Sequence, residues 1–479
     1  MNMKTWISLF VGLAVLSSCK FQRSADWVTS TELAPWEVQP DLRALPLDSV
    51  ASVDAVIDLD GKQQKMEGFG ACFNELGWIS LSRLDPSQRE DIMEELFFPD
   101  YGANFTLCRM PIGANDFSRD WYSYNETDSD FVMNNFTIAN DLQTLIPFIK
   151  NAQKYNSQLA LWASPWCPPS WMKYNKHYAC AFTGAEVDTL YRNGLPADKV
   201  GYQGLDMFVQ DSAYLEAYAL YFTKFIEAYR SHGIEISAVM PQNEFNSAQI
   251  FPSCCWTATS LAYFIGNYLG PAMKDLDVDV LFGTMERADE SMVDTVLTDP
   301  LAREYIKGVG FQWAGKGAIK GIHERYPDLT LYQTEQECGD GKNDWKGAVY
   351  SWQLMKHYLD NGASAYMYWN ISLEKGGISR WGWAQNSLVV VDPLSKTYTY
   401  TPEYYVLKHV SHYVQPDARK LTVSGSYGNI MAFRNPDRSL VIVAANEEDT
   451  DKTVAIQVQD MVFMPTLKAH SFSTIQIKQ

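Results

Sequence analysis

The pattern that most constrains this fold is a two-part unit, a short apolar run followed by an amphipathic stretch, that recurs eight times along the chain. The apolar runs span 66–70, 104–111, 158–166, 236–244, 278–283, 306–313, 329–335 and 363–370. The stretches between them include 87–97, 213–230 and 346–359, where apolar residues recur at helical spacing. Strands that alternate with helices form a parallel sheet, and eight such units close into a barrel. We therefore predict an α/β fold, a (β/α)8 TIM barrel with insertions, over residues 65–398.

The chain after about residue 399 has a different pattern. Short β-rich runs at 421–424, 430–434, 440–445, 453–458 and 471–477 are separated by turns rich in Gly, Asn, Asp and Pro. This pattern predicts an appended β-sandwich domain over residues 399–479. Residues 36–64 hold a further β-rich stretch, and its strands are candidates to join the sandwich from the N-terminal side.

The N-terminus has the features of an export signal. A positively charged start is followed by an apolar run of about a dozen residues, which is too short to span a membrane. Leu16-Ser17-Ser18-Cys19 resembles a bacterial lipobox, in which the cysteine is acylated; the alternative is an ordinary signal peptide with an incidental cysteine. We expect residues 1–18 to be a lipoprotein-type signal peptide and residues 19–35 a tether. The expected location is lipid-anchored through Cys19, periplasmic or outer-membrane associated, in a Gram-negative bacterium.

Charge and composition exclude several classes of partner and site. The net charge of −18 argues against nucleic acid and against membrane contact other than the lipid anchor. Seven cysteines follow Cys19, so at least one is unpaired and the chain is not a disulfide-stapled scaffold. Neither Cys-x-x-Cys nor His-Glu-x-x-His occurs, and we expect no metal. Aromatic residues make up 14% of the chain; most must serve packing, and some are candidates to line a sugar-binding cleft.

Two predicted strands end in a glutamate. Asn243-Glu244 closes the fourth run and Thr334-Glu335 closes the seventh, and neither pair is specific by itself. The two glutamates are 91 positions apart, close to three barrel units of about 31 residues each. Carboxylates at the C-terminal ends of these strands face each other across a barrel mouth, as the acid/base and the nucleophile of a retaining glycosidase must. Glu337 is an alternative nucleophile if the seventh strand continues.

The segment 163–173 is the most distinctive in the chain. It reads Ala-Ser-Pro-Trp-Cys-Pro-Pro-Ser-Trp-Met-Lys, and its prolines impose an extended path that ends the strand. Trp166 and Trp171 are then placed near the barrel mouth. We expect Trp166 to line the cleft, and for Trp171 a cleft role and a core role are equally open.

These motifs resemble glycoside hydrolase family 30, the family of glucosylceramidases and β-1,6-glucanases. The resemblance begins near residue 60 and rests on motifs that occur in the family's order: Glu67-Gly68-Phe69-Gly70-Ala71-Cys72-Phe73-Asn74-Glu75, Arg109-Met110-Pro111-Ile112-Gly113-Ala114-Asn115-Asp116-Phe117-Ser118, the Ala-Ser-Pro-Trp segment, Asn243-Glu244, Thr334-Glu335 and Trp369-Asn370. It implies a barrel fused to a β-sandwich, a retaining mechanism and no cofactor. It also implies that Glu244 is the acid/base and Glu335 the nucleophile.

The resemblance also implies roles for the residues around the pair. Substrate-binding roles fall on Glu75, Trp166, Asn243 and Trp369. Arg109 has a supporting role, because a buried cation beside the nucleophile keeps that carboxylate ionised.

Residues 311–314 depart from the glucosylceramidase pattern. They read Phe-Gln-Trp-Ala, so Gln312 and Trp313 would contact the leaving-group side of the substrate, and Asn370 supports the site from the eighth strand. The departure favours a β-1,6-glucanase that acts on β-1,6-glucan. The alternatives are a glucosylceramidase-like exo-β-glucosidase, a β-xylosidase and, more remotely, a non-catalytic glycan-binding lipoprotein.

Overall fold

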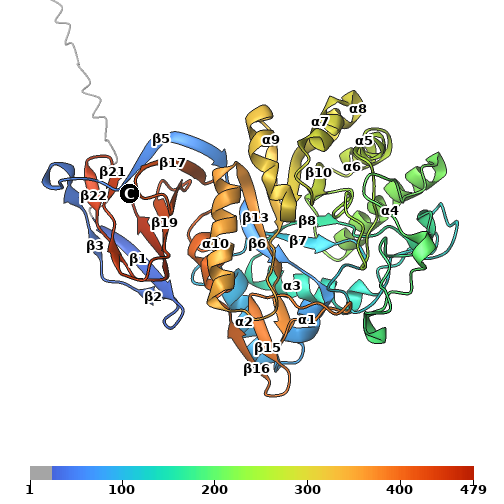
Figure 1. Ribbon diagram of the computed structural model, residues 1–479, viewed down its shortest axis with the longest axis horizontal. Helices are drawn as coiled ribbons and strands as arrows, with labels where there is room; N and C mark the ends of the chain where they lie inside the picture. Colours follow the sequence, from blue (N-terminus) through green and yellow to red (C-terminus); the bar gives the residue numbers. More distant parts are fainter. Residues whose placement is uncertain (1–23) are drawn as a thin grey trace, which may run out of the picture.

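The computed structural model describes residues 24–479, which form a barrel and a β-sandwich that lie side by side (Figure 1). The expected signal peptide and the Cys19 anchor lie outside the described residues. Within residues 24–479 no helix is long and apolar enough to cross a membrane.

The larger part is a closed barrel of eight parallel strands. The strands are β6 Gly68–Cys72, β7 Leu107–Pro111, β8 Ala160–Ser164, β9 Ala238–Val239, β10 Asp279–Met285, β11 Ile306–Gln312, β12 Thr330–Glu335 and β13 Ala363–Asn370. The ring closes where β13 pairs with β6. The predicted (β/α)8 barrel is therefore confirmed.

Helices surround the barrel and bury their apolar faces against it (Figure 1). They are α1 Glu75–Leu81, α2 Pro86–Phe97, α3 Leu145–Tyr155, α4 Ser212–Ser231, α5 Ala258–Phe264, α6 Gly270–Asp275, α7 Glu290–Thr298, α8 Pro300–Tyr305, α9 Ile319–Arg325 and α10 Trp345–Asp360. A further helix, α11 Pro402–Ser411, begins after the predicted barrel boundary at residue 398 but still packs against α10.

Strand β9 is shorter than the predicted run 236–244. Pro241 has no N–H to donate to a neighbouring strand, so the regular ladder stops before it. The chain then continues irregularly along β8, where Asn243 N donates to Pro165 O. Glu244 follows with a positive φ of 47°, an uncommon conformation for a residue with a side chain. Glu244 therefore lies in a turn beyond β9 and not in the strand itself.

The second part is a sandwich built on one sheet of eleven strands, and it draws on both ends of the chain. The strands are β1 Ser24–Thr31, β2 Glu37–Val38, β3 Leu42–Arg43, β4 Leu45–Pro46, β5 Ala55–Lys65, β17 Arg419–Gly425, β18 Ile430–Arg434, β19 Leu440–Asn446, β21 Ile456–Val458, β22 Met461–Phe463 and β24 Ser471–Ile477. A separate pair is β20 Lys452–Thr453 with β23 Thr466–Leu467.

The N-terminal strands pair with C-terminal ones. β1 pairs along most of its length with β24, and β5 pairs with β17. Residues 24–31 are thus a strand, where the sequence predicts a tether, because the strand pairs with β24 and buries Ala25 and Trp27 in the sandwich core. Only the part of the predicted tether before residue 24 lies outside the described chain.

A long excursion follows the last barrel strand. It contains a small sheet of β14 Ser372–Glu374, β15 Val389–Asp392 and β16 Thr397–Tyr400. Between β14 and β15 the chain forms a loop, residues 375–388, at the C-terminal end of the barrel strands. Loops at this end of a TIM barrel form the active site.

Candidate active site

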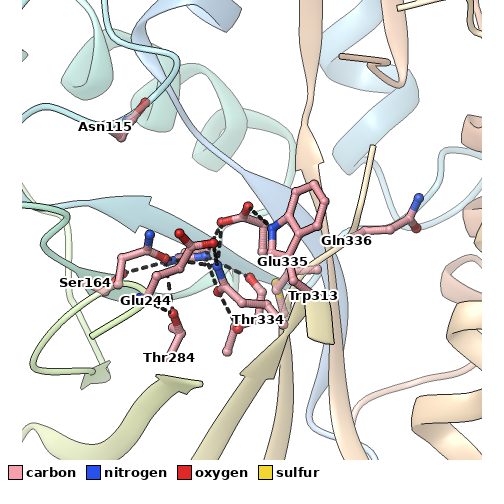
Figure 2. A network of polar contacts seen from close by, with 12 residues as sticks. Asn115, Ser164, Glu244, Thr284, Trp313, Thr334, Glu335 and Gln336 are labelled. Carbon is pink, nitrogen blue, oxygen red and sulfur yellow. Dashed lines mark hydrogen bonds and ion pairs between the residues drawn. The ribbon is translucent and has the colours of Figure 1, made fainter. Parts of the chain in front are cut away.

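The two predicted glutamates meet at the C-terminal end of the barrel. Glu335 is the last residue of β12, and Glu244 lies beyond the end of β9, which is separated from β12 by β10 and β11. Both side chains are almost fully buried. Figure 2 shows them pointing toward the same group of hydrogen-bond donors.

One amide bridges the two carboxylates. Gln312, the last residue of β11, places its Nε2 3.2 Å from Glu244 Oε1 and 3.3 Å from Glu335 Oε2. These two oxygens can therefore be no farther apart than the sum of the two distances. Retaining glycosidases hold their two carboxyls about 5–5.5 Å apart, a spacing that lies within this limit. The geometry fits a retaining pair.

Arg109 is the cation of the site and is completely buried. Its Nη1 donates to Glu335 Oε2 at 2.9 Å, and its Nη2 donates to Asn243 Oδ1 at 2.7 Å and to Ser164 Oγ at 2.9 Å. The guanidinium also lies 4.3 Å from the ring centroid of Trp166, a cation–π contact. Contacts with Ser164, Asn243 and the indole ring of Trp166 thus keep the Arg109 guanidinium beside Glu335.

The environment of Glu335 favours ionisation more than the environment of Glu244 does. Burial raises the pKa of Glu335, but Arg109 and a hydrogen bond from Trp313 oppose this shift. Trp313 Nε1 donates to Glu335 Oε1 at 3.1 Å, so both carboxylate oxygens accept hydrogen bonds (Figure 2).

Glu244 has the opposite environment. Burial, and then the negative charges of Glu335 and Asp116, raise the pKa of Glu244 to about 8. Its Oε2 accepts a hydrogen bond from Gln249 Nε2 at 3.1 Å, and its backbone N–H donates to Thr284 Oγ1 at 2.9 Å. Two neighbouring carboxyls whose environments separate their pKa values in this way can serve as an acid and a nucleophile. Near neutral pH the proton of the pair resides on Glu244.

The carboxylate pair opens into a cavity of about 580 Å³. Its lining includes both glutamates, Trp166, Trp313, Gln249 and Asp116. Three other predicted substrate-binding residues lie behind this wall. Gln312 donates to both carboxylates, Asn243 accepts a hydrogen bond from Arg109, and Trp369 stacks on Trp166 with ring centroids 5.3 Å apart.

Asp116 was missed as a site residue. It lies in the motif that begins at Arg109, but past the end of β7 at Pro111, where sequence alone does not say which way the chain turns. The structure places it in the cavity wall, where burial, and next the charge of Glu335, raise the pKa of its carboxyl well above the usual range. Its position five residues beyond a barrel strand was the available signal.

Glu75 lies apart from the carboxylate pair. It is the first residue of α1, and its oxygens accept hydrogen bonds from Asn140 and Thr144 and form an ion pair with Arg119. The Glu75 carboxylate is thus occupied by protein partners and does not line the cavity, unlike Asp116, because β6 ends three residues earlier and the chain turns into a helix.

The remaining candidates separate clearly. Trp171 is buried against Phe131 and does not line the cavity, so of the two roles left open for it the structure supports the core role. Glu337 forms an ion pair with Lys316, so Glu335 and not Glu337 is the carboxylate that faces Glu244. Asn370 donates to Gln385 Oε1 at 3.0 Å, and Gln385 lines the cavity, so Asn370 supports the wall.

Among residues 24–479 no group of His, Cys, Asp or Glu side chains is arranged to hold a metal ion.

Comparison with known proteins gives consistent matches over most of the chain. The model of the glycosyl hydrolase family 30 TIM-barrel domain matches residues 66–194 and 197–414, and that of the family's β-sandwich domain matches residues 417–475. The chain is 26% identical over 436 residues to a lysosomal acid glucosylceramidase of Mus musculus, covering 85% of this chain and 79% of the relative. It is 27% identical over 429 residues to an endo-1,6-β-D-glucanase of Aspergillus fumigatus, covering 83% and 82%. A solved structure described as an endo-β1,6-glucanase superposes with a TM-score of 0.78 at 22% identity, covering 95% and 98%.

Proposed function

The chain belongs to glycosyl hydrolase family 30, and from that premise we propose that it is a retaining β-glycosidase with Glu335 as nucleophile and Glu244 as acid/base. As a member of this family it is a glycoside hydrolase that acts on a glucoside or glycan. The observation that carries the assignment of roles is the asymmetry of the pair: the cation Arg109 contacts Glu335, whereas Glu244 is buried beside the negative charge of Glu335.

The proposed reaction has two displacements. In the first, the Glu335 carboxylate bonds to the anomeric carbon while the bond to the leaving oxygen breaks, and Glu244 gives its proton to that oxygen. In the second, Glu244 takes a proton from water, the water oxygen bonds to the anomeric carbon, and Glu335 is released. Two inversions give net retention. Asp116, Trp166 and Trp313 line the cavity where the sugar must sit, and we propose that they bind it, with Asn243 and Trp369 holding this wall in place.

The substrate we propose is β-1,6-glucan. Support comes from the similarity to an endo-1,6-β-D-glucanase and from Gln312 and Trp313, whose polar atoms surround the carboxylates. A glucosylceramidase-like exo-β-glucosidase is the second candidate, because the chain is at least as similar to glucosylceramidases, with 30% identity over 443 residues to a putative glucosylceramidase of Caenorhabditis elegans.

Product analysis tests both the mechanism and the linkage. Incubation with β-1,6-glucan is expected to yield short β-1,6-linked products that NMR first detects as the β-anomer. Gentiobiose, glucosylceramide and aryl β-xylosides serve as competing substrates. First-formed α-anomer would contradict retention, and cleavage of glucosylceramide without cleavage of the glucan would favour the second candidate.

The two pKa environments predict a bell-shaped pH profile for kcat/KM. The acid/base must start protonated, and the pKa of Glu244 is raised to about 8, so activity is expected to fall as the pH rises through about 8. On the acid side activity falls as Glu335 takes up a proton and stops being a nucleophile. Initial rates across the pH range check this, and an activity that keeps increasing well above pH 8 would assign the acid role to another group.

We also propose that the protein is exported and anchored in a membrane leaflet through an acylated Cys19. Cells grown with labelled palmitate are expected to label the wild type and not Cys19→Ala. An unlabelled wild type contradicts the anchor and leaves the enzymatic proposal untouched.

A further inference from the structure

A row of aromatic rings extends from the cavity. The rings of Phe251 and Trp383 lie 5.1 Å apart, Trp383 and Trp381 lie 6.4 Å apart with planes 25° from parallel, and Trp381 meets Trp121 at 4.9 Å. The four residues come from three separate loops of the barrel. We refer to Phe251, Trp383, Trp381 and Trp121 as the aromatic row.

The row meets the cavity on the side of the acid/base. Phe251 and Trp383 both line the cavity, and Phe251 follows Glu244 by seven residues in the same loop. That loop also carries Gln249, whose amide donates to Glu244 Oε2 at 3.1 Å. An acid/base must reach the oxygen that leaves, so the wall beside it faces the leaving group.

The residues that line the cavity differ in exposure. Trp166 and Asp116 are 1% and 5% exposed, whereas Phe251 and Trp383 are only half-buried. A fully buried wall encloses a ring, while a half-buried wall is open to solvent and lets a longer molecule continue outward. The row is therefore placed where the rest of a substrate leaves the cavity.

The row is built to hold flat faces in one position. Trp381, which is 3% exposed, lies behind Trp383, and Trp121 packs against Trp381 and stacks on Tyr178 at 5.5 Å. Because rotation of such packed indoles is hindered, little conformational entropy is lost when a ring stacks on them. Flat apolar faces with polar groups beside them suit a pyranose ring.

Polar groups beside the row argue against a lipid in this position. Gln249 and Gln385 line the same cavity, together with Glu286, which is paired with Arg287. Covering such charged and amide groups with an acyl chain removes their water without replacing the hydrogen bonds, which is costly. Sugar hydroxyls can replace those hydrogen bonds.

We propose that Trp383 and Phe251 form a binding site for a sugar ring on the leaving-group side, so that the aglycone is a saccharide and not a lipid. The proposal rests on the proposed glycosidase function and specifies its substrate class. Trp383 stacks on the first ring beyond the cleaved bond, and Phe251 flanks it.

The test compares a substrate that has an aglycone ring with one that has none. β-Glucosyl fluoride loses only fluoride, whereas β-1,6-glucotetraose places sugar rings on the row. For Trp383→Ala we expect the ratio of kcat/KM for the tetraose to that for the fluoride to fall about tenfold, as for the loss of one stacked ring. Phe251→Ala is expected to lower the same ratio by a smaller factor, and Trp383→Phe to restore most of it.

Tyr101→Ala is the matched control, because Tyr101 is an exposed aromatic residue in the loop before β7, at the opposite end of the barrel. It is expected to leave the ratio unchanged. An equal loss on both substrates, or no loss on the tetraose, overturns the proposal, as does a wild type that cleaves the fluoride and glucosylceramide but not the tetraose. If the wild type cleaves neither the fluoride nor the tetraose, the β-glucosidase function itself fails.

Discussion

Replacing Glu335 by alanine is expected to lower kcat for β-glucoside hydrolysis by about four orders of magnitude or more, because no other group can form the covalent intermediate. Glu244→Ala is expected to cause a comparable loss with substrates whose leaving group needs a proton. Azide separates the two roles. In Glu335→Ala it attacks from the nucleophile's side and yields an α-glycosyl azide, whereas in Glu244→Ala it attacks the covalent intermediate and yields a β-glycosyl azide.

Glu337 provides the matched control for this experiment. It lies two residues beyond the proposed nucleophile on the same segment, but its carboxylate is engaged by Lys316 and Tyr350. Glu337→Gln is expected to keep most of the activity. Normal turnover by Glu335→Ala or Glu244→Ala, or an equally large loss in Glu337→Gln, would contradict the assignment, and NMR of the azide products would show which group had been misassigned.

Replacing Arg109 by methionine is expected to damage both the reaction and the fold. The buried guanidinium is the cation that contacts Glu335, and it also bonds to Asn243 and Ser164. Its removal leaves a carboxylate without a counter-ion in a buried site, which typically costs about 3–5 kcal/mol. The free energy of unfolding from urea titration should fall by about that amount, and kcat should fall because the nucleophile is no longer held ionised.

The pH profile distinguishes this electrostatic role from a purely structural one. Without Arg109 the pKa of Glu335 should rise, so the acid limb of kcat/KM should move to higher pH. Arg325→Met is the control, since Arg325 is an exposed arginine paired with Glu290 and Asp294, and surface pairs contribute about 0–1 kcal/mol. An Arg109→Met enzyme as stable as Arg325→Met, or one with an unmoved acid limb, would refute the proposed role.

The barrel could be predicted from the sequence because its signals are local. Apolar runs of strand length and amphipathic stretches reflect which side chains must leave water, and this depends on near neighbours in the chain. Glu335 could be identified in the same way, since it ends β12 and a regular strand carries its direction to the last residue. Likewise, the three-unit spacing between Glu244 and Glu335 follows from counting barrel units.

Beyond the end of a strand, the local sequence no longer predicts the direction of the chain. Glu75 and Asp116 both follow barrel strands, yet one starts a helix and bonds to Arg119 while the other lines the cavity. The choice between them depends on the path of each loop, which distant packing decides. The same holds for β1, whose place in the sandwich depends on pairing with β24 at the other end of the chain.

The sequence by itself thus determined the architecture and selected the two glutamates as the candidate pair, because hydrophobic periodicity, strand spacing and the family's motifs can all be read along the chain. The resemblance implied their separate roles, but only the tertiary structure decided which groups surround each glutamate and so make the two differ. Gln312 bridges them, Arg109 contacts Glu335, and burial beside the charge of Glu335 raises the pKa of Glu244. Electrostatic effects in a buried site depend on distances between groups far apart in the chain, and those distances exist only once the barrel has closed.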